Sequence, residues 1–223
     1  MDSVREDLVR VFGSRLLSLV AYGDGRHMAV VSSLSAADLA ALMPFVSRWR
    51  AAGHGVPLLL TRAELERSLD AFPIEYGAIL GKHELVHGTD PFAGLAISRD
   101  DLRRACERQA KSHLIHLREG LLETGGSPSA VSELIASSAP AFRALLKAVL
   151  RLTNQTGPLP HSTLDLNDET LAQLADSTLG LPKSTVRDVL GADRGRPVDA
   201  QALIPAYITL TERLWTLVDT WHG

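Results

Sequence analysis

A glycine turn near the amino terminus has residue types suited to holding an anion. Tyr22-Gly23-Asp24-Gly25-Arg26 joins two apolar runs. Glycine lets backbone N–H groups approach a phosphate closely, and an arginine beside them adds positive charge. We therefore expect Gly23, Gly25 and Arg26 to bind a nucleotide or another anion weakly, since Asp24 would repel it. The other glycine site, Gly13-Ser14, is typical of a helix stop.

Four histidines could in principle hold a metal ion. His83 and His87 are four residues apart, which suits zinc only on a helix, and we predict strand there. His113 and His116 are three apart on a predicted helix and share a face, but a metal site also needs a carboxylate or a third histidine, for which Glu84 is the candidate. We expect hydrogen-bonding histidines and no metal site.

One predicted helix carries a single cysteine and a basic flank. Cys106 lies on its apolar stripe, which favours a buried thiol over a reactive one. The flank consists of Arg99, Arg103, Arg104, Arg108 and Lys111, with acidic residues nearby. We expect these cations to be solvated and paired with acids.

Composition excludes several classes of protein. The chain has 223 residues and a formal net charge of −3, which argues against a broad nucleic-acid interface. One cysteine allows no intrachain disulfide, and no apolar run reaches the length of a membrane span. The acidic start does not resemble a signal peptide, so we expect a cytoplasmic protein without membrane contact.

Apolar periodicity and turn residues predict alternating elements in the first 95 residues. Capping boxes at Ser35/Asp38 and Thr61/Glu64 begin two of the helices. Helices are predicted over 4–17, 36–52 and 62–69, and strands over 16–22, 28–34, 56–60, 72–79 and 83–86.

The remainder of the chain is predicted to be helical. Ser98 with Asp101 begins a long helix to about Glu123, and Pro128 begins another to about Leu152. A loop over 155–168 precedes helices at 168–178, 182–190 and 198–221. The sequence therefore predicts an α+β protein, with a mixed-sheet domain over 1–95 and an all-α bundle over 96–223.

The order helix, strand, glycine turn, strand, helix, strand resembles the minimal nucleotidyltransferase domain. In kanamycin-type nucleotidyltransferases and the two-part MNT–HEPN proteins, this domain precedes a helical bundle. The segment Asp70–Gln109 resembles the passage from such a domain into its first bundle helix. The resemblance implies a nucleotidyltransferase-like α/β domain followed by a HEPN-like or kanamycin-nucleotidyltransferase-type bundle.

The family's chemistry requires a Gly-Ser turn, an Asp-x-Asp pair on the next strand and a third carboxylate, which together hold two metal ions. Here the turn carries Asp24 in place of serine, and Met28–Ser33 contains no carboxylate. Glu75 is the match for the third acid. We expect a catalytically inactive scaffold, binding or interaction module without a cofactor. The alternative is a transferase that uses Asp24 and Glu75 with one Mg²⁺.

The bundle half of the resemblance implies a second alternative. HEPN ribonucleases carry an arginine and a histidine separated by four to six residues, and Arg108 and His113 match that spacing. The alternative is therefore a metal-independent ribonuclease. The bundle is also the expected surface for a homodimer, with Trp215 and Trp221 as candidates for the seam.

Overall fold

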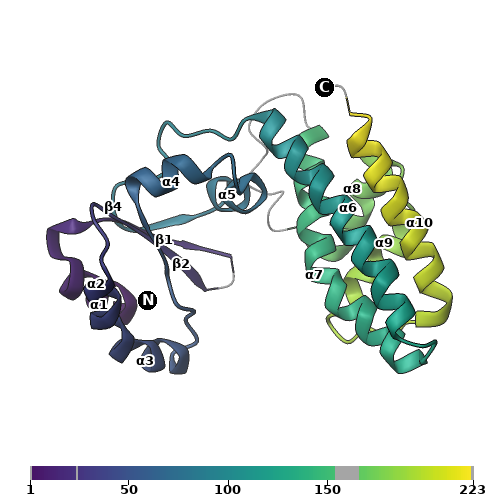
Figure 1. The fold of residues 1–223 in the computed structure, drawn as a ribbon, viewed down its shortest axis with the longest axis horizontal. Coiled ribbons are helices and arrows are strands. Elements are labelled where there is room, and N and C mark those ends of the chain that lie inside the picture. Colours follow the sequence, from purple (N-terminus) through teal and green to yellow (C-terminus); the bar gives the residue numbers. More distant parts are fainter. Residues whose placement is uncertain (1, 24, 154–165, 222–223) are drawn as a thin grey trace. The chain divides into compact units, whose positions relative to one another are not determined.

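The computed structural model describes residues 2–23, 25–153 and 166–221. The chain divides into two compact units, Met1–Ile97 and Ser98–Gly223. The sequence analysis places the boundary two residues earlier, between residues 95 and 96. The first unit mixes helices and strands, and the described part of the second is helical (Figure 1). The chain is therefore an α+β protein, and each unit is described by itself.

The first unit, here called the α/β unit, contains a four-stranded sheet. Its elements are α1 (Asp2–Phe12), β1 (Leu16–Tyr22), β2 (Arg26–Val31), α2 (Ala36–Leu42), α3 (Val46–Ala51), β3 (Leu58–Thr61), α4 (Arg62–Ser68), α5 (Pro73–Gly81) and β4 (Glu84–Gly88). The strand order is β3-β2-β1-β4. β1 is antiparallel to β2 and to β4, and β2 is parallel to β3.

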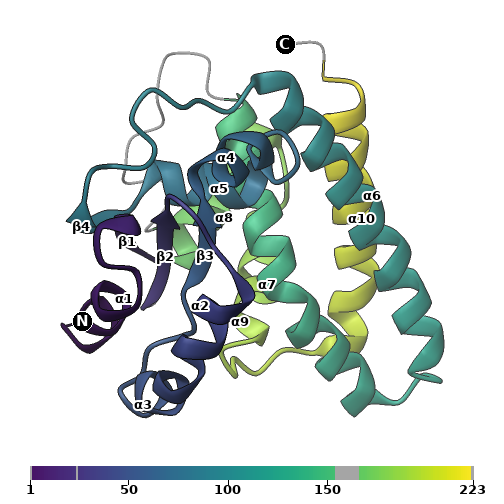
Figure 2. The ribbon, with the colours of Figure 1, turned by 60° about the vertical axis from the view of Figure 1, so that its left-hand side comes forward.

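Helices cover both faces of this sheet (Figures 1 and 2). On one face α1, α2 and α3 pack against the sheet around Leu8, Leu19 and Trp49. On the other face α4 and α5 pack around Met28, Leu65 and Tyr76. β2 is therefore buried on both sides, which explains why it reads as a nearly continuous apolar run.

The sequence prediction is wrong between residues 72 and 79, where the structure has helix α5 and not a strand. Pro73 occupies the first turn of α5, a position that tolerates proline because its N–H would have no helical partner. Short apolar runs fit either period, so the pattern did not separate a buried helix from a strand. The first helix also ends early, at Phe12, and the second strand ends at Val31 instead of Leu34.

Gly88 fixes the contact between β4 and β1. Its φ is +76°, and a Cβ atom at this position would lie 1.9 Å from the carbonyl oxygen of Leu17. Gly88 faces Ser18 across the ladder, and the register of β1 shifts at both of its pairings. Only glycine allows the two backbones to approach this closely.

The second unit, here called the helical unit, is a bundle (Figures 1 and 2). Its helices are α6 (Arg99–Glu123), α7 (Pro128–Thr153), α8 (Asp168–Leu179), α9 (Lys183–Ala192) and α10 (Ala200–Asp219). These bounds agree with the sequence prediction to within two residues, while most of the predicted loop 155–168 lies outside the described residues. No helix in the described ranges is long and apolar enough to cross a membrane.

Arg143 joins three helices of the bundle. Its guanidinium contacts Asp168 in the first turn of α8 at 3.1 Å and both carboxylate oxygens of Asp193 at the end of α9 at 2.9 Å. Its Nη2 also donates to the carbonyl of Leu190 at 2.7 Å. The Arg143 side chain is 15% exposed, and the pKa of Asp193 is lowered by its hydrogen bond to this guanidinium.

Candidate functional site

The glycine turn between β1 and β2 contains a hydrogen bond of its own. Gly23 and Gly25 have φ values of +51° and +71°, and the N–H of Gly25 donates to the carbonyl of Gly23 at 3.1 Å. One of the two expected anion donors is therefore already used within the turn. Asp24 lies outside the described residues.

Arg26 places its positive charge directly on this turn. Its guanidinium lies 4.9 Å from the centre of the Tyr22 ring. A Cβ atom on Gly23 would lie only 2.7 Å from Arg26 Nη2, so the absence of a side chain at Gly23 makes room for the guanidinium. Arg26 is exposed and can meet an anion there.

Glu75 does not occupy a strand next to this turn. It lies in the first turn of α5, with an exposed side chain. A carboxylate at a helix N-terminus is favoured by the helix dipole, which explains its presence without a metal ion. Within the part of the chain that the structure describes, no three His, Cys, Asp or Glu side chains are grouped for metal binding.

Other carboxylates of the α/β unit have structural partners. Asp38 caps α2, accepts two hydrogen bonds from Arg15 at 3.0 and 2.6 Å, and has its pKa lowered, chiefly by Arg15. Asp7, 1% exposed, contacts Arg48 and accepts from the indole N–H of Trp49 at 2.9 Å. Through these contacts the two acids anchor α1, α2 and α3.

Arg108 and His113 are not brought together. His113 is 8% exposed, whereas Arg108 on the same helix is exposed. Five residues correspond to about 140° around a helix, so the two side chains leave α6 in different directions. Burial, with a smaller contribution from His116, lowers the pKa of His113 to about 4, so the ring is neutral at neutral pH.

The remaining histidines of the sequence analysis have separate roles. His83 precedes β4 and contacts the carbonyl of Ile79 at 3.0 Å and Asp90 at 3.2 Å, which ties the end of α5 to the segment after β4. His87 lies within β4, one residue beyond the end of the predicted strand over 83–86. His116 is exposed and contacts Glu119 at 3.2 Å.

Cys106 and most of the basic flank also have ordinary structural explanations. Cys106 is fully buried, and burial raises the pKa of its thiol to about 12. Arg99 donates to the carbonyl of Leu152, while Arg103 and Arg104 pair with acids on their own helix. These contacts agree with the expected paired flank.

The C-terminal tryptophans are half-buried. The Lys111 ammonium lies 5.3 Å from the centre of the Trp215 ring. The indole nitrogens of Trp215 and Trp221 are buried without a hydrogen-bond partner within the described ranges. These contacts do not test the expected homodimer seam.

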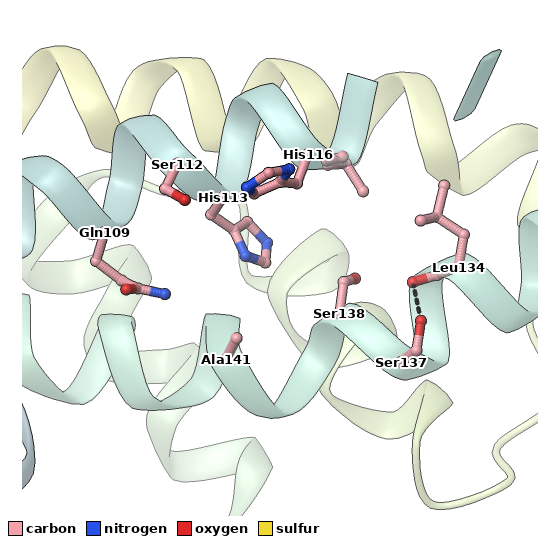
Figure 3. A pocket seen from close by; sticks show the side chains of 9 residues that line it. Gln109, Ser112, His113, His116, Leu134, Ser137, Ser138 and Ala141 are labelled. Atoms are coloured by element: carbon pink, nitrogen blue, oxygen red, sulfur yellow. Dashed lines mark hydrogen bonds between the residues drawn. The ribbon is translucent and has the colours of Figure 1, made fainter. Parts of the chain in front are cut away.

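A pocket of about 250 Å³ between α6 and α7 is the feature that the sequence analysis missed (Figure 3). His113 lies in its wall, and His113 Nε2 is 2.6 Å from the hydroxyl of Tyr207 on α10. That hydroxyl is 3.2 Å from Ser138 Oγ on α7. Three helices thus meet in one polar network.

The network could not be read from local patterns, because His113 and Tyr207 are 94 residues apart. The available signal was a run of hydroxyl residues, Ser137-Ser138, within the otherwise apolar pattern of α7. No protein-family model, curated protein or solved structure matches the chain.

Proposed function

We propose that this protein is a non-catalytic, nucleotidyltransferase-like scaffold whose α/β unit binds a nucleotide or another anion at the Gly23–Arg26 turn. The arrangement of its carboxylates is the observation that carries the proposal. β2, the strand that follows the turn, presents Arg26 and His27 and then only apolar residues. Metal-dependent nucleotidyl transfer needs several carboxylates at that position to hold two cations against a triphosphate.

The occupied acids support the same conclusion. Asp7 and Asp38 are engaged with Arg48 and Arg15, and Asp90 accepts from the N–H of Phe92 at 2.8 Å in addition to its contact with His83. Releasing any of these carboxylates for a metal ion would break contacts that position α1, α2 or the segment after β4. The acids therefore serve the fold.

The geometry of the turn supports anion binding without a metal ion. The Arg26 guanidinium lies at the turn, and an arginine fork can contact phosphate or carboxylate oxygens through two N–H groups. Within this proposal the helical unit supplies contacts to a partner or to a second copy. Ile115 and Leu122, exposed one heptad apart on α6, support that role.

Two measurements on the full chain test the proposal. With radiolabelled nucleoside triphosphates and Mg²⁺ or Mn²⁺, we expect no label on the protein or on added acceptors. In a thermal shift assay, we expect ATP or inorganic triphosphate to raise the melting temperature without a metal ion, since a ligand that binds the folded state stabilises it.

Paired arginine variants locate the binding. Arg26→Ala should abolish the thermal shift, whereas Arg67→Ala, which removes an exposed arginine on α4, should leave it unchanged. Metal-dependent incorporation of label would show that a working transferase site exists. A thermal shift that persists in Arg26→Ala would place the anion elsewhere.

A further inference from the structure

The pocket between α6 and α7 interrupts a seam that is otherwise filled. Buried apolar side chains such as Leu114, Ile135 and Leu146 occupy these two helices on either side. At the pocket the lining is Gln109, Ser112, His113, His116, Leu117, Leu134, Ser137, Ser138 and Ala141. Short side chains on both helices thus leave an opening at a place where the bundle could have been closed by larger ones.

The His113 ring points into this opening (Figure 3). In the figure, Gln109 and Ser112 of α6 lie on one side and Ser138 and Ala141 of α7 on the other. Tyr207 holds the ring through Nε2. Within the described parts of the chain, no protein group forms a hydrogen bond with its second nitrogen, Nδ1, so a polar atom of a side chain that is 92% buried is left for the pocket.

The protons of the network assign a role to Nδ1. Ser138 Oγ lies 2.9 Å from the carbonyl of Ile135, which can only accept, so the serine proton is used there. All three contacts are then satisfied together when Tyr207 donates to Ser138 Oγ and Nε2–H of His113 donates to Tyr207. A neutral imidazole has one N–H, so Nδ1 is an acceptor.

The charge of the lining restricts the ligand further. The lining contains no Asp, Glu, Lys or Arg, and the low pKa of His113 keeps its ring neutral at neutral pH. Gln109 and Ser112 each carry both donor and acceptor atoms, whereas Ser137 donates to the carbonyl of Leu134 at 3.1 Å and keeps its oxygen as an acceptor (Figure 3). An uncharged ligand would therefore find hydrogen-bond partners, whereas an ion would find no Asp, Glu, Lys or Arg among the lining residues.

We propose that this pocket binds a small, neutral, planar heterocycle that donates an N–H to Nδ1 of His113. A drug-sized ligand needs about 300–1,000 Å³, so a pocket of about 250 Å³ suits a single- or double-ring molecule of nucleobase size. Heteroaromatic rings are small neutral molecules that carry an N–H beside acceptor atoms, which matches the unpartnered Nδ1 and the amide and hydroxyl groups of the lining. This site lies in the helical unit and is independent of the proposed anion site.

NMR of the full ¹⁵N-labelled chain tests both the acceptor and the ligand, with adenine, hypoxanthine and uracil as probes. We expect Nδ1 of His113 to be unprotonated in the free protein. At least one of the three bases should shift the Nδ1 signal of His113 in a saturable way, with a Kd below about 1 mM. 1,3-Dimethyluracil has the flat ring of uracil but no N–H. It should bind at least tenfold more weakly than whichever of the three bases binds best.

Matched alanine replacements on α7 provide the control. Ala141→Leu places a larger side chain in the pocket and should weaken base binding at least tenfold, whereas Ala144→Leu, on the same helix outside the lining, should not. Ser137→Leu, with Ser132→Leu as its control, replaces this pair if Ala141→Leu does not fold.

Three results would overturn the proposal: a protonated Nδ1 in the free protein, no saturable binding of any of the three bases, or binding that Ala141→Leu leaves unchanged. Arg26→Ala should not alter base binding, because that side chain belongs to the other unit. Failure of this proposal is therefore distinguishable from failure of the anion site.

Discussion

In the α/β unit, the Arg15–Asp38 ion pair lies at the start of one helix, α2. In the helical unit, Arg143 and His113 each belong to a polar network that joins three helices. The Arg15 side chain is 36% exposed and that of Arg143 is 15% exposed. Surface pairs contribute little because water screens them, but a buried charge that loses its partner is costly.

This difference separates two uses of polar residues. In the α/β unit the capping boxes fix where α2 and α4 begin, and the exposed Arg26 at the Gly23–Arg26 turn carries the proposed function. In the helical unit they specify which helices meet, and the His113 network leaves one nitrogen for a ligand. The two proposed sites therefore differ in kind: one uses an exposed charge at a turn, and the other uses neutral groups in a pocket between two helices.

The largest effect that would sharpen this comparison is expected for Arg143→Ala. The change leaves Asp193 without its bidentate partner and removes hydrogen bonds from one side chain of α7 to residues of both α8 and the end of α9. We expect a loss of about 3 kcal/mol in the free energy of unfolding of the helical unit. Segment-resolved hydrogen exchange during urea titration measures it.

The control for Arg143 is Arg118→Ala. Arg118 pairs with Glu212 between α6 and α10, but both side chains are about half exposed. We expect a change within about 0.5 kcal/mol. Equal losses in the two variants would contradict the distinction between buried and surface charges.

Local signals made one part of this molecule predictable. Both capping boxes, at Ser35/Asp38 and Thr61/Glu64, are present as the sequence predicts, because all partners lie within three residues. The bundle helices were predictable for a similar reason, since each has a long apolar stripe bounded by a cap or a proline. Sequence reasoning therefore found the elements that depend on neighbours along the chain.

Long-range partners were not predictable. Asp193 is 50 residues from Arg143, and no local pattern distinguishes it from other exposed-looking acids. The prediction of a strand over 72–79 was wrong because this segment is a helix, with Tyr76 and Ile79 buried against the sheet. Local patterns could not predict where that sheet lies. His113 was identified as a candidate, but for its spacing from Arg108 and not for its contact with Tyr207.

The next effect is the pH dependence that His113 gives to the stability of the helical unit. The folded pKa of His113 is about 4, below the value of about 6.5 of an unfolded chain, so the unfolded state binds the proton first. The contribution of His113 to stability should be full above about pH 6.5, fall as the pH drops towards 4, and level off below that, while carboxylates with a lowered pKa such as Asp193 add a further loss at lower pH. The total loss from His113 is about 3 kcal/mol.

Segment-resolved hydrogen exchange against pH measures this dependence, because the lowered pKa of buried His27 acts in the same direction within the α/β unit. His113→Leu should flatten the profile of the helical unit, and His116→Ala, which removes an exposed histidine on the same helix, should not. Direct NMR titration of the His113 ring provides the same answer if His113→Leu is unstable. A midpoint near 6.5 would contradict the prediction.

The smallest effect concerns the helix starts of the α/β unit. Ser35→Ala removes the side-chain oxygen that accepts from the N–H of Asp38, and Thr61→Ala does the same at Glu64. Each should cost about 1 kcal/mol and raise exchange in α2 or α4 alone. Ser33→Ala, an exposed serine outside both caps, should change neither. Larger losses that spread through the whole unit would mean that these caps hold the sheet as well as the helix ends, and the contrast with the helical unit would then fail.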